Sequence, residues 1–338
     1  MASRRLNPPS IANPSHVPTA EPRAEFRSHA LTLPPEALGL RFDQALARAL
    51  PQYSRARVRQ WIESGAVQVE GRTLRPRDKV LGGEQVRIEA QLPVQTAAAA
   101  EALPLEVVFK DRALLVINKP AGLVVHPGAG NPRHTLQNAL LAFDPRLALV
   151  PRAGLVHRLD KDTSGLLVVA RTPEAHTALV AAMAAREIGR EYLAVCTGVM
   201  TGGGTIDKPI ARHRTQRTRM AVRADGRESI THYRVVTRFR AHTLVRVELE
   251  TGRTHQIRVH LAHAGFPVVG DPVYGGRRRI PAGCTPALAA ELAGFSRQAL
   301  HAAHLKLQHP VTGREMAWEA PLPPDMQRLL GALEKDRP

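Results

Sequence analysis

The sequence predicts an α+β protein in which a small domain precedes a larger domain built on a mixed or antiparallel sheet. Residues 32–92 combine two short amphipathic helices with two short strands. Residues 93–103 are rich in alanine and are typical of a linker. Residues 104–330 contain many strands with few helices between them, which favours an α+β domain. The 338 residues are enough for both units.

Residues 1–31 are predicted to be a disordered basic tail. No apolar core of a signal peptide follows Arg4 and Arg5, and no apolar run approaches the roughly 18 residues that span a bilayer. With only Cys196 and Cys284, a disulfide framework is excluded, so we expect a cytoplasmic protein with no membrane partner. Five prolines would break the helix of a transit peptide: Pro8, Pro9, Pro14, Pro18 and Pro22.

Two helices and two strands are expected in the small domain. Ser54 is a good N-cap for the second helix, which Gly65 ends. The stretches AVQVEG and EQVRIEA are typical of short strands. The first helix ends at Pro51 and carries apolar residues at helical spacing: Phe42, Ala45, Leu46, Ala49 and Leu50.

The large domain is predicted to contain at least five strands and three helices. The strands are ALLVINK, GLLVVAR, REYLAVC, THYRVVTRF and the cleanly alternating TLVRVELE. The helices are TLQNALLAF, PEAHTALVAAMAARE and THQIRVHLAHAG. Thr172 caps the second of these, with Pro173 at its first position, and Gly265 ends the third.

The charge of the chain indicates a polyanionic partner. Lys and Arg number 47 against 30 Asp and Glu, which gives a net charge of +17. An excess of this size favours nucleic acid, because phosphate backbones are the commonest polyanion that proteins bind. A solubility device and an anionic membrane surface are the alternatives.

The stretch HRLDKDTSG, residues 157–165, concentrates polar side chains between two apolar runs. A calcium loop is excluded because its twelfth position would be Arg171 and not glutamate. An aspartyl-phosphate site is disfavoured because His157 and Arg158 would repel its metal. A tight turn explains the DTSG residues, but it leaves Arg158 and Asp160 unexplained. The remaining interpretation is a catalytic carboxylate, Asp160, beside a cationic wall.

The second helix of the small domain carries three arginines: Arg55 and Arg59 flank one side of its apolar face and Arg57 the other. Across residues 41–88 the domain resembles the RNA-binding module shared with small-subunit ribosomal protein S-four. The resemblance implies that these arginines contact RNA, whereas the residues alone fit solvated side chains equally well. The matching positions are Arg41, Asp43, Leu46, Ser54, Arg55, Ile62, Gly65, Val67, Val69, Gly71, Gly83, Glu84, Val86 and Ile88.

The large domain resembles the RluA family of pseudouridine synthases. The stretches that carry the resemblance are INKPAGLVVHPG, GLVHRLDKDTSGLLVVA, REYLAV and TGRTHQIRVHLAHAGFPVVGDPVYG, in the order of the family. The resemblance implies a monomeric enzyme that isomerises specific uridines in large-subunit (23S) ribosomal RNA. Because the reaction oxidises nothing and moves no phosphate, a carboxylate suffices, as nucleophile or as base, and no cofactor is expected.

Family resemblance also implies the roles of four residues. Asp160 matches the catalytic carboxylate and Arg258 matches the arginine that pairs with it. Tyr192 matches the tyrosine that stacks on uracil, and Arg158 matches the arginine that fills the space vacated by the flipped uridine. Planar guanidinium suits that place because it stacks on bases and binds phosphate.

Three points stay open in the sequence. A non-catalytic RNA-binding factor on the same scaffold, and a family member acting on transfer RNA or another large-subunit site, are rival hypotheses. Arg277–Arg279 either touch RNA or form a solvated loop. No metal site is predicted, because the two histidine groups lack nearby acids and cysteines; they are His255, His260 and His263, and His301, His304 and His309.

Overall fold

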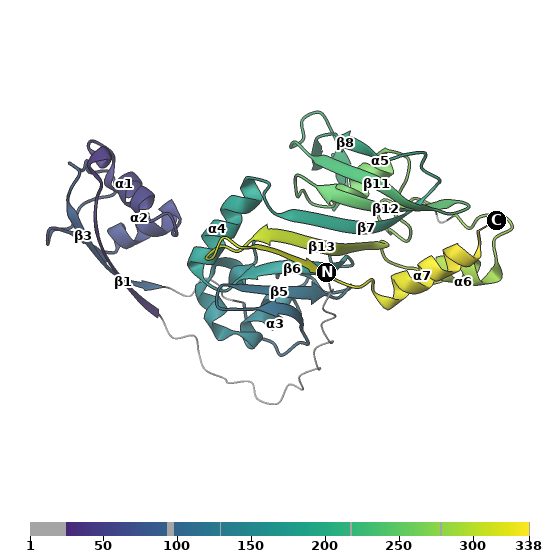
Figure 1. Ribbon diagram of the computed structural model, residues 1–338, viewed down its shortest axis with the longest axis horizontal. Coiled ribbons are helices and arrows are strands. Elements are labelled where there is room, and N and C mark those ends of the chain that lie inside the picture. Colours follow the sequence, from purple (N-terminus) through teal and green to yellow (C-terminus); the bar gives the residue numbers. More distant parts are fainter. Residues whose placement is uncertain (1–24, 93–97, 129, 217, 278, 338) are drawn as a thin grey trace, which may run out of the picture.

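The computed structural model describes residues 25–92, 98–128, 130–216, 218–277 and 279–337, and it confirms the α+β class (Figure 1). Residues 1–24 of the expected tail and residues 93–97 of the expected linker lie outside the described residues. Residues 25–31 differ from the expected disorder, because they form most of strand β1, Glu25–Thr32. All eight residues of β1 pair with β3, so this polar stretch is held by its backbone ladder.

The small domain packs two helices on a three-stranded antiparallel sheet. The strand order is β1-β3-β2, with β2 at Val67–Val69 and β3 at Gln85–Leu92. The helices are α1, Phe42–Ala49, and α2, Arg55–Glu63, preceded by the 3-10 helix η1, Pro35–Ala37. The predicted cap of α2 is confirmed, since the Ser54 hydroxyl accepts a hydrogen bond from the amide of Arg57.

The large domain is built on a nine-stranded mixed sheet. Its order is β4-β5-β6-β13-β7-β12-β11-β8, and β14 pairs with β13. Only the β6–β13 pairing is parallel. The strands are β4 (Glu106–Lys110), β5 (Leu114–Lys119), β6 (Ser164–Ala170), β7 (Gly189–Thr197), β8 (Gly204–Asp207), β11 (Ile230–Arg238), β12 (His242–Leu249), β13 (Leu300–Gln308) and β14 (Glu315–Glu319). A separate hairpin pairs β9 (Ile210–Arg212) with β10 (Met220–Val222).

Both faces of the central strands are buried. Along β6, Leu167 and Val169 belong to one apolar core, while Leu166 and Val168 belong to another on the opposite face. Helix α4, Pro173–Ala184, covers the second core through Leu179. Side chains of the other helices lie in the first core: α3 (Leu136–Phe143), α5 (Gln256–His263), α6 (Pro286–Gly294) and α7 (Pro324–Lys335). The 3-10 helices η2 (Pro145–Leu149) and η3 (Pro151–Gly154) link α3 to the turn before β6.

The C-terminal helix lengthens the large domain beyond the expected boundary at residue 330. Helix α7 runs across residue 330 to Lys335, and Leu333, past that position, is buried in the first core. The domain therefore includes residues past 330, because cutting there would expose the apolar side of the helix.

The two domains touch through polar and apolar contacts. The Tyr53 hydroxyl donates to Glu174 Oε1 at the start of α4, at 3.0 Å. Leu149 of η2 packs into the core of the small domain. No helix in the described ranges has both the length and the apolar character needed to cross a membrane.

Candidate active site

The stretch HRLDKDTSG contains a tight turn, and its last two residues, Ser164 and Gly165, begin β6. The amide of Thr163 donates to the carbonyl of Asp160 at 3.1 Å, which closes the turn. Gly165 adopts φ of 115°, and a Cβ there would lie 2.2 Å from the carbonyl oxygen of Ala302. Only glycine combines that conformation with so close an approach to β13. The turn thus spans residues 160–163, two positions earlier than the DTSG turn that the sequence predicted, and it places Asp160 at its first position.

A buried lysine, Lys119, stabilises this turn by a hydrogen bond to its backbone. The side chain of Lys119 is fully buried, and its Nζ donates to the carbonyls of Pro120, Leu123 and Lys161. Burial lowers the pKa of Lys119 to about 7, although nearby acids oppose the shift. Three carbonyl acceptors match the three donors of an ammonium group. This geometry favours the charged form and ties the backbone next to Asp160 to strand β5.

Asp160 and Arg258 meet although 98 positions separate them. Arg258 Nη1 donates to Asp160 Oδ2 at 2.9 Å, and the two side chains are 5% and 15% exposed. Burial opposes the charged form of Arg258, but its bonds to Asp271 and Asp160 outweigh that cost and raise its pKa. The guanidinium therefore remains a permanent cation against the carboxylate.

Asp271 was not singled out from the sequence. Its carboxylate is fully buried and holds Arg258 with two short bonds, Nε to Oδ2 at 2.7 Å and Nη2 to Oδ1 at 2.8 Å. The amides of Val273 and Tyr274 also donate to Oδ1. Burial alone would raise the pKa of Asp271, but these partners hold it below its ordinary value. The Asp-Pro turn within GDPVYG was the available signal.

Tyr192 lies on β7 and is 6% exposed within the same cavity as Asp160. Burial raises the pKa of its phenol, Arg190 lowers it and Asp160 raises it, with a net upward shift. The phenol is therefore protonated at neutral pH. Its ring offers an apolar wall and its hydroxyl offers a donor.

His255 is a second residue that sequence analysis did not assign to the site. The amide of Met220 donates to the Tyr274 hydroxyl at 2.9 Å, and that hydroxyl lies 2.8 Å from His255 Nδ1. If the phenolic proton points to Nδ1, the remaining ring proton is on Nε2, which lies 3.9 Å from Asp160 Oδ1. Burial lowers the pKa of His255, partly offset by Asp160. A neutral imidazole therefore faces the carboxylate.

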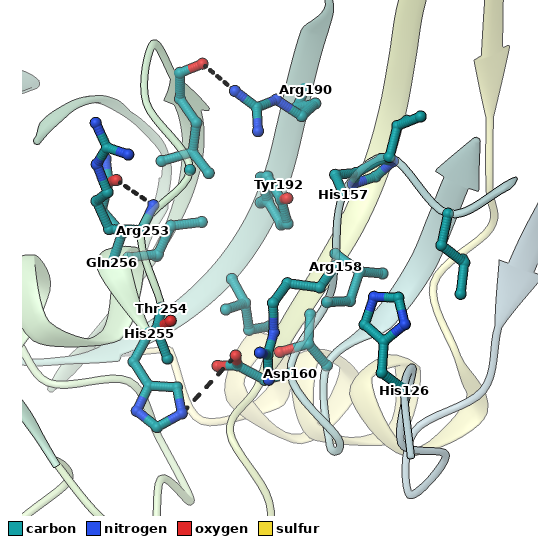
Figure 2. A pocket seen from close by; sticks show the side chains of 18 of the residues that line it. His126, His157, Arg158, Asp160, Arg190, Tyr192, Arg253, Thr254, His255 and Gln256 are labelled. Atoms are coloured by element: carbon teal, nitrogen blue, oxygen red, sulfur yellow. Dashed lines mark hydrogen bonds and ion pairs between the residues drawn. The ribbon is translucent and has the colours of Figure 1, made fainter. Parts of the chain in front are cut away.

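Four of these residues line a cavity of about 610 Å³: Asp160, Tyr192, His255 and Arg258. Figure 2 shows Asp160, Arg158 and His255 near one another, with Tyr192 and Arg190 across the cavity. Arg158 is exposed at the wall, and other cationic side chains share the lining: Arg152, Arg190 and Arg253. The cavity thus combines one carboxylate with several guanidinium groups, which suits a substrate that carries phosphate.

The arginines of the small domain do not line this cavity. Arg55 pairs with Asp43 at 2.7 Å and Arg59 pairs with Glu63 at 2.7 Å, both with half-exposed side chains. Arg57 differs from the expected surface position, since it is 9% exposed and its burial lowers its pKa. Residue 57 lies four positions before the buried Trp61, so its side chain is on the same, core-facing side of α2. RNA contact by these three residues stays a prediction.

The remaining described basic residues singled out in the sequence, Arg277 and Arg279, and the two histidine groups lie outside the cavity except for His255. Arg277 and Arg279 are exposed, and Arg278 lies outside the described residues. His260 bonds Thr231 and the carbonyl of Lys208, and His301 bonds Ser164. Within the described ranges, no three His, Cys, Asp or Glu side chains are grouped as metal ligands.

Known proteins resemble this chain along most of its length. The family model described as RNA pseudouridylate synthase matches residues 113–263, and the S4 domain model matches residues 40–86. A ribosomal large subunit pseudouridine synthase D from Xanthomonas campestris pv. campestris is 57% identical over 304 residues, which is 90% of this chain and 92% of the relative. The protein of that name from Pseudomonas aeruginosa is 55% identical over 314 residues, 93% of this chain and 98% of the relative.

A solved structure gives the same result for the large domain. Human RNA Pseudouridylate Synthase Domain Containing 4 superposes with a TM-score of 0.54 at 26% identity, covering 68% of this chain and 93% of the human chain. The sequence similarity extends over both domains and includes the turn with Asp160 and the helix with Arg258. The chain therefore belongs to the RluA family and is a pseudouridine synthase.

Proposed function

We propose that this enzyme isomerises specific uridines to pseudouridine in large-subunit (23S) ribosomal RNA, with Asp160 as the catalytic carboxylate and without a cofactor. The relatives named above are ribosomal large subunit pseudouridine synthases, which supports ribosomal RNA as the substrate class. The net charge of +17 supports binding to RNA phosphates. The proposal includes action as a monomer in the cytoplasm, where the free cysteines Cys196 and Cys284 would stay reduced.

The observation that carries the proposal is the position of Asp160. It is the only carboxylate among the lining residues of the cavity within the described part of the chain. The reaction breaks the C1′–N1 bond, turns the uracil and forms a C1′–C5 bond; the C5 proton leaves and N1 gains a proton. Asp160 starts this sequence either by attacking C1′ or by removing a proton from C2′.

Three neighbours assist Asp160 in this proposal. Arg258 orients the carboxylate through the 2.9 Å contact. Tyr192 stacks on the uracil and offers its phenol for a late proton transfer. Arg158 stands at the exposed wall of the cavity, where it fills the space left by the flipped uridine and offsets a flipping cost of a few kcal/mol.

The test is Asp160→Asn with release of tritium from uracil C5 as the readout. The amide keeps the size of the side chain but is a poor nucleophile and a poor base. We expect turnover to fall by at least about 10²–10⁴-fold. RNA binding should persist because removing an anion does not weaken contact with phosphates. Arg258 would keep its two bonds to Asp271, so the fold should also persist.

Asp162→Asn is the matched control. Asp162 belongs to the same turn, but it does not line the cavity. This variant should retain turnover. Near-normal tritium release by Asp160→Asn, with loss in Asp162→Asn, would show that the wrong carboxylate has been assigned.

A further inference from the structure

Arg190 is a buried cation that the proposed mechanism does not use. It lies on β7 two positions before Tyr192, so both side chains emerge on the same face of the strand. The residue is 7% exposed and lines the cavity of Asp160. It is therefore one of the least accessible of the cationic groups around that cavity.

The protein leaves this guanidinium with few partners. Among the described residues, its one hydrogen bond runs from Nη2 to the carbonyl of Leu249 and is long, at 3.4 Å. The buried Nε has no partner, and no acid of the described residues forms an ion pair with Arg190. A buried charge without a partner is costly. Its retention in the wall of an active site indicates that the missing acceptor comes from the substrate.

The backbone makes room for the guanidinium. Gly252 also lines the cavity, and a Cβ at this position would lie 2.8 Å from Arg190 Nη1. A side chain at residue 252 would push the guanidinium out of place. Gly252 and Arg190 together form a small built site with free donors.

The order of residues across the cavity indicates which acceptor reaches Arg190. Figure 2 shows Asp160, Tyr192 and Arg190 in sequence, with Tyr192 between the other two. Residues two apart on a strand are about 6.6 Å apart, roughly one pyrimidine ring with its exocyclic oxygen. With the ribose at Asp160 and the base on Tyr192, the edge of the uracil opposite the glycosidic bond points to Arg190.

We propose that Arg190 donates a hydrogen bond to the pyrimidine carbonyl that lies opposite the glycosidic bond. In uridine the bond is at N1, and the opposite ring atom is C4, which carries O4. In pseudouridine the bond is at C5, and the opposite atom is C2, which carries O2. One fixed donor therefore satisfies both substrate and product, although the ring has turned. This inference rests on the proposed placement of the ribose at Asp160.

The same donor would act during the reaction. When the C1′–N1 bond breaks, its electron pair stays on N1 and spreads by resonance onto O2 and O4. A buried guanidinium at O4 stabilises this charge. Cytidine carries an amino group in place of O4. This group donates hydrogen bonds, so it could not accept one from the guanidinium of Arg190. Arg190 is therefore assigned both to stabilising the leaving base and to selecting uracil.

The experiment combines Arg190→Met with an atomic change in the RNA. Two target RNAs, tritiated at C5 of the target base, carry either uridine or 4-thiouridine, whose sulfur is a weaker acceptor. Arg190→Met should lower kcat/KM on the uridine RNA on the order of 10²-fold. The sulfur substitution should lower kcat/KM of the native enzyme about 10-fold but leave that of the variant nearly unchanged, because the bond is already absent. Arg246→Met removes an exposed arginine from the neighbouring strand β12 and should preserve the native pattern.

Three outcomes would overturn the inference. Equal sulfur effects in the native and variant enzymes would show that Arg190 does not contact O4. A weaker RNA affinity with a salt slope reduced by about 1 would assign Arg190 to a phosphate instead. A variant that does not fold would show that the protein itself needs the guanidinium, whereas removal of a poorly paired buried charge should leave thermal stability unchanged or raised.

The Asp160 variants separate this inference from the proposed function. If Asp160→Asn loses turnover but the sulfur substitution has equal effects in the native enzyme and in Arg190→Met, only the role of Arg190 is refuted. If Asp160→Asn retains turnover, the proposed catalytic role of Asp160 is refuted, and so is the position of the uracil that was inferred from it.

Discussion

Asp271→Asn tests how the cation next to Asp160 is held in place. The carboxylate of Asp271 is fully buried and accepts two bonds from Arg258 and two from backbone amides. An asparagine oxygen can keep the bonds made at Oδ1, but its amino group would face the Nε donor of Arg258. The change therefore breaks one charge-assisted bond and removes the charge of a buried pair. We expect a loss of about 3–5 kcal/mol in the free energy of unfolding.

Acid should narrow the stability difference between the native enzyme and Asp271→Asn. Hydrogen bonds from Arg258 hold the pKa of Asp271 below its ordinary value of 3.8, although burial opposes them. Its contribution to stability is thus complete above pH 3.8 and is lost as the pH falls through the lowered pKa. The native enzyme has this contribution to lose, whereas the variant has none. The difference should be constant at pH 5–7 and shrink at about pH 3 and below.

The assay is urea unfolding followed by fluorescence. Trp318 reports on the large domain, and replacing Trp61 by Phe removes the signal of the small domain. Asp325→Asn is the matched control, because Asp325 also holds an arginine with two bonds but is 33% exposed. It should cost about 1 kcal/mol. A loss below about 1 kcal/mol for Asp271→Asn at pH 7 would refute the reasoning, as would a difference that persists unchanged in acid.

Two further predictions concern the wall of the cavity and the turn. Arg158→Ala should slow turnover of a paired or stacked uridine more than that of a uridine already extruded, since the flipping cost is then absent. Rates on a duplex and on an open-loop substrate give the comparison, and equal losses would place Arg158 at the chemical step. Gly165→Ala should lower the free energy of unfolding by roughly 2–6 kcal/mol through positive φ and the clash with Ala302. Gly122→Ala is the control, because Gly122 also has positive φ but a Cβ there meets no atom within 4 Å. If urea titrations show equal losses of unfolding free energy for the two variants, the clash with Ala302 does not contribute.

Periodicity and turn residues predicted the local structure well. The alternation in TLVRVELE corresponds to β12, and the stripe beginning at Phe42 corresponds to α1. Ser54, Thr172 and Gly265 begin or end helices as their chemistry suggests. These features depend on neighbours a few residues apart, which a single sequence displays directly.

Features that depend on distant partners were missed. Strand β1 carries few apolar residues and exists because β3 supplies its hydrogen bonds. Asp271 and His255 look like ordinary turn and helix residues until the fold brings them to Arg258 and Asp160. Arg190 was assigned to a strand and to a stretch that resembles the family, but no periodicity reveals that its buried Nε lacks a partner among the described residues.

The order of strands in the large sheet limits how early in its synthesis the enzyme can become active. The turn with Asp160 leads into β6, and Tyr192 lies on β7, but these strands do not pair with each other. Strand β13, residues 300–308, lies between them and pairs with both. A nascent chain that has emerged only through α5, residues 256–263, contains Asp160, Tyr192 and Arg258, yet the centre of its sheet is open. Contacts this far apart in sequence form slowly. We therefore expect activity to appear only after β13 has left the ribosome, because that strand joins β6 to β7.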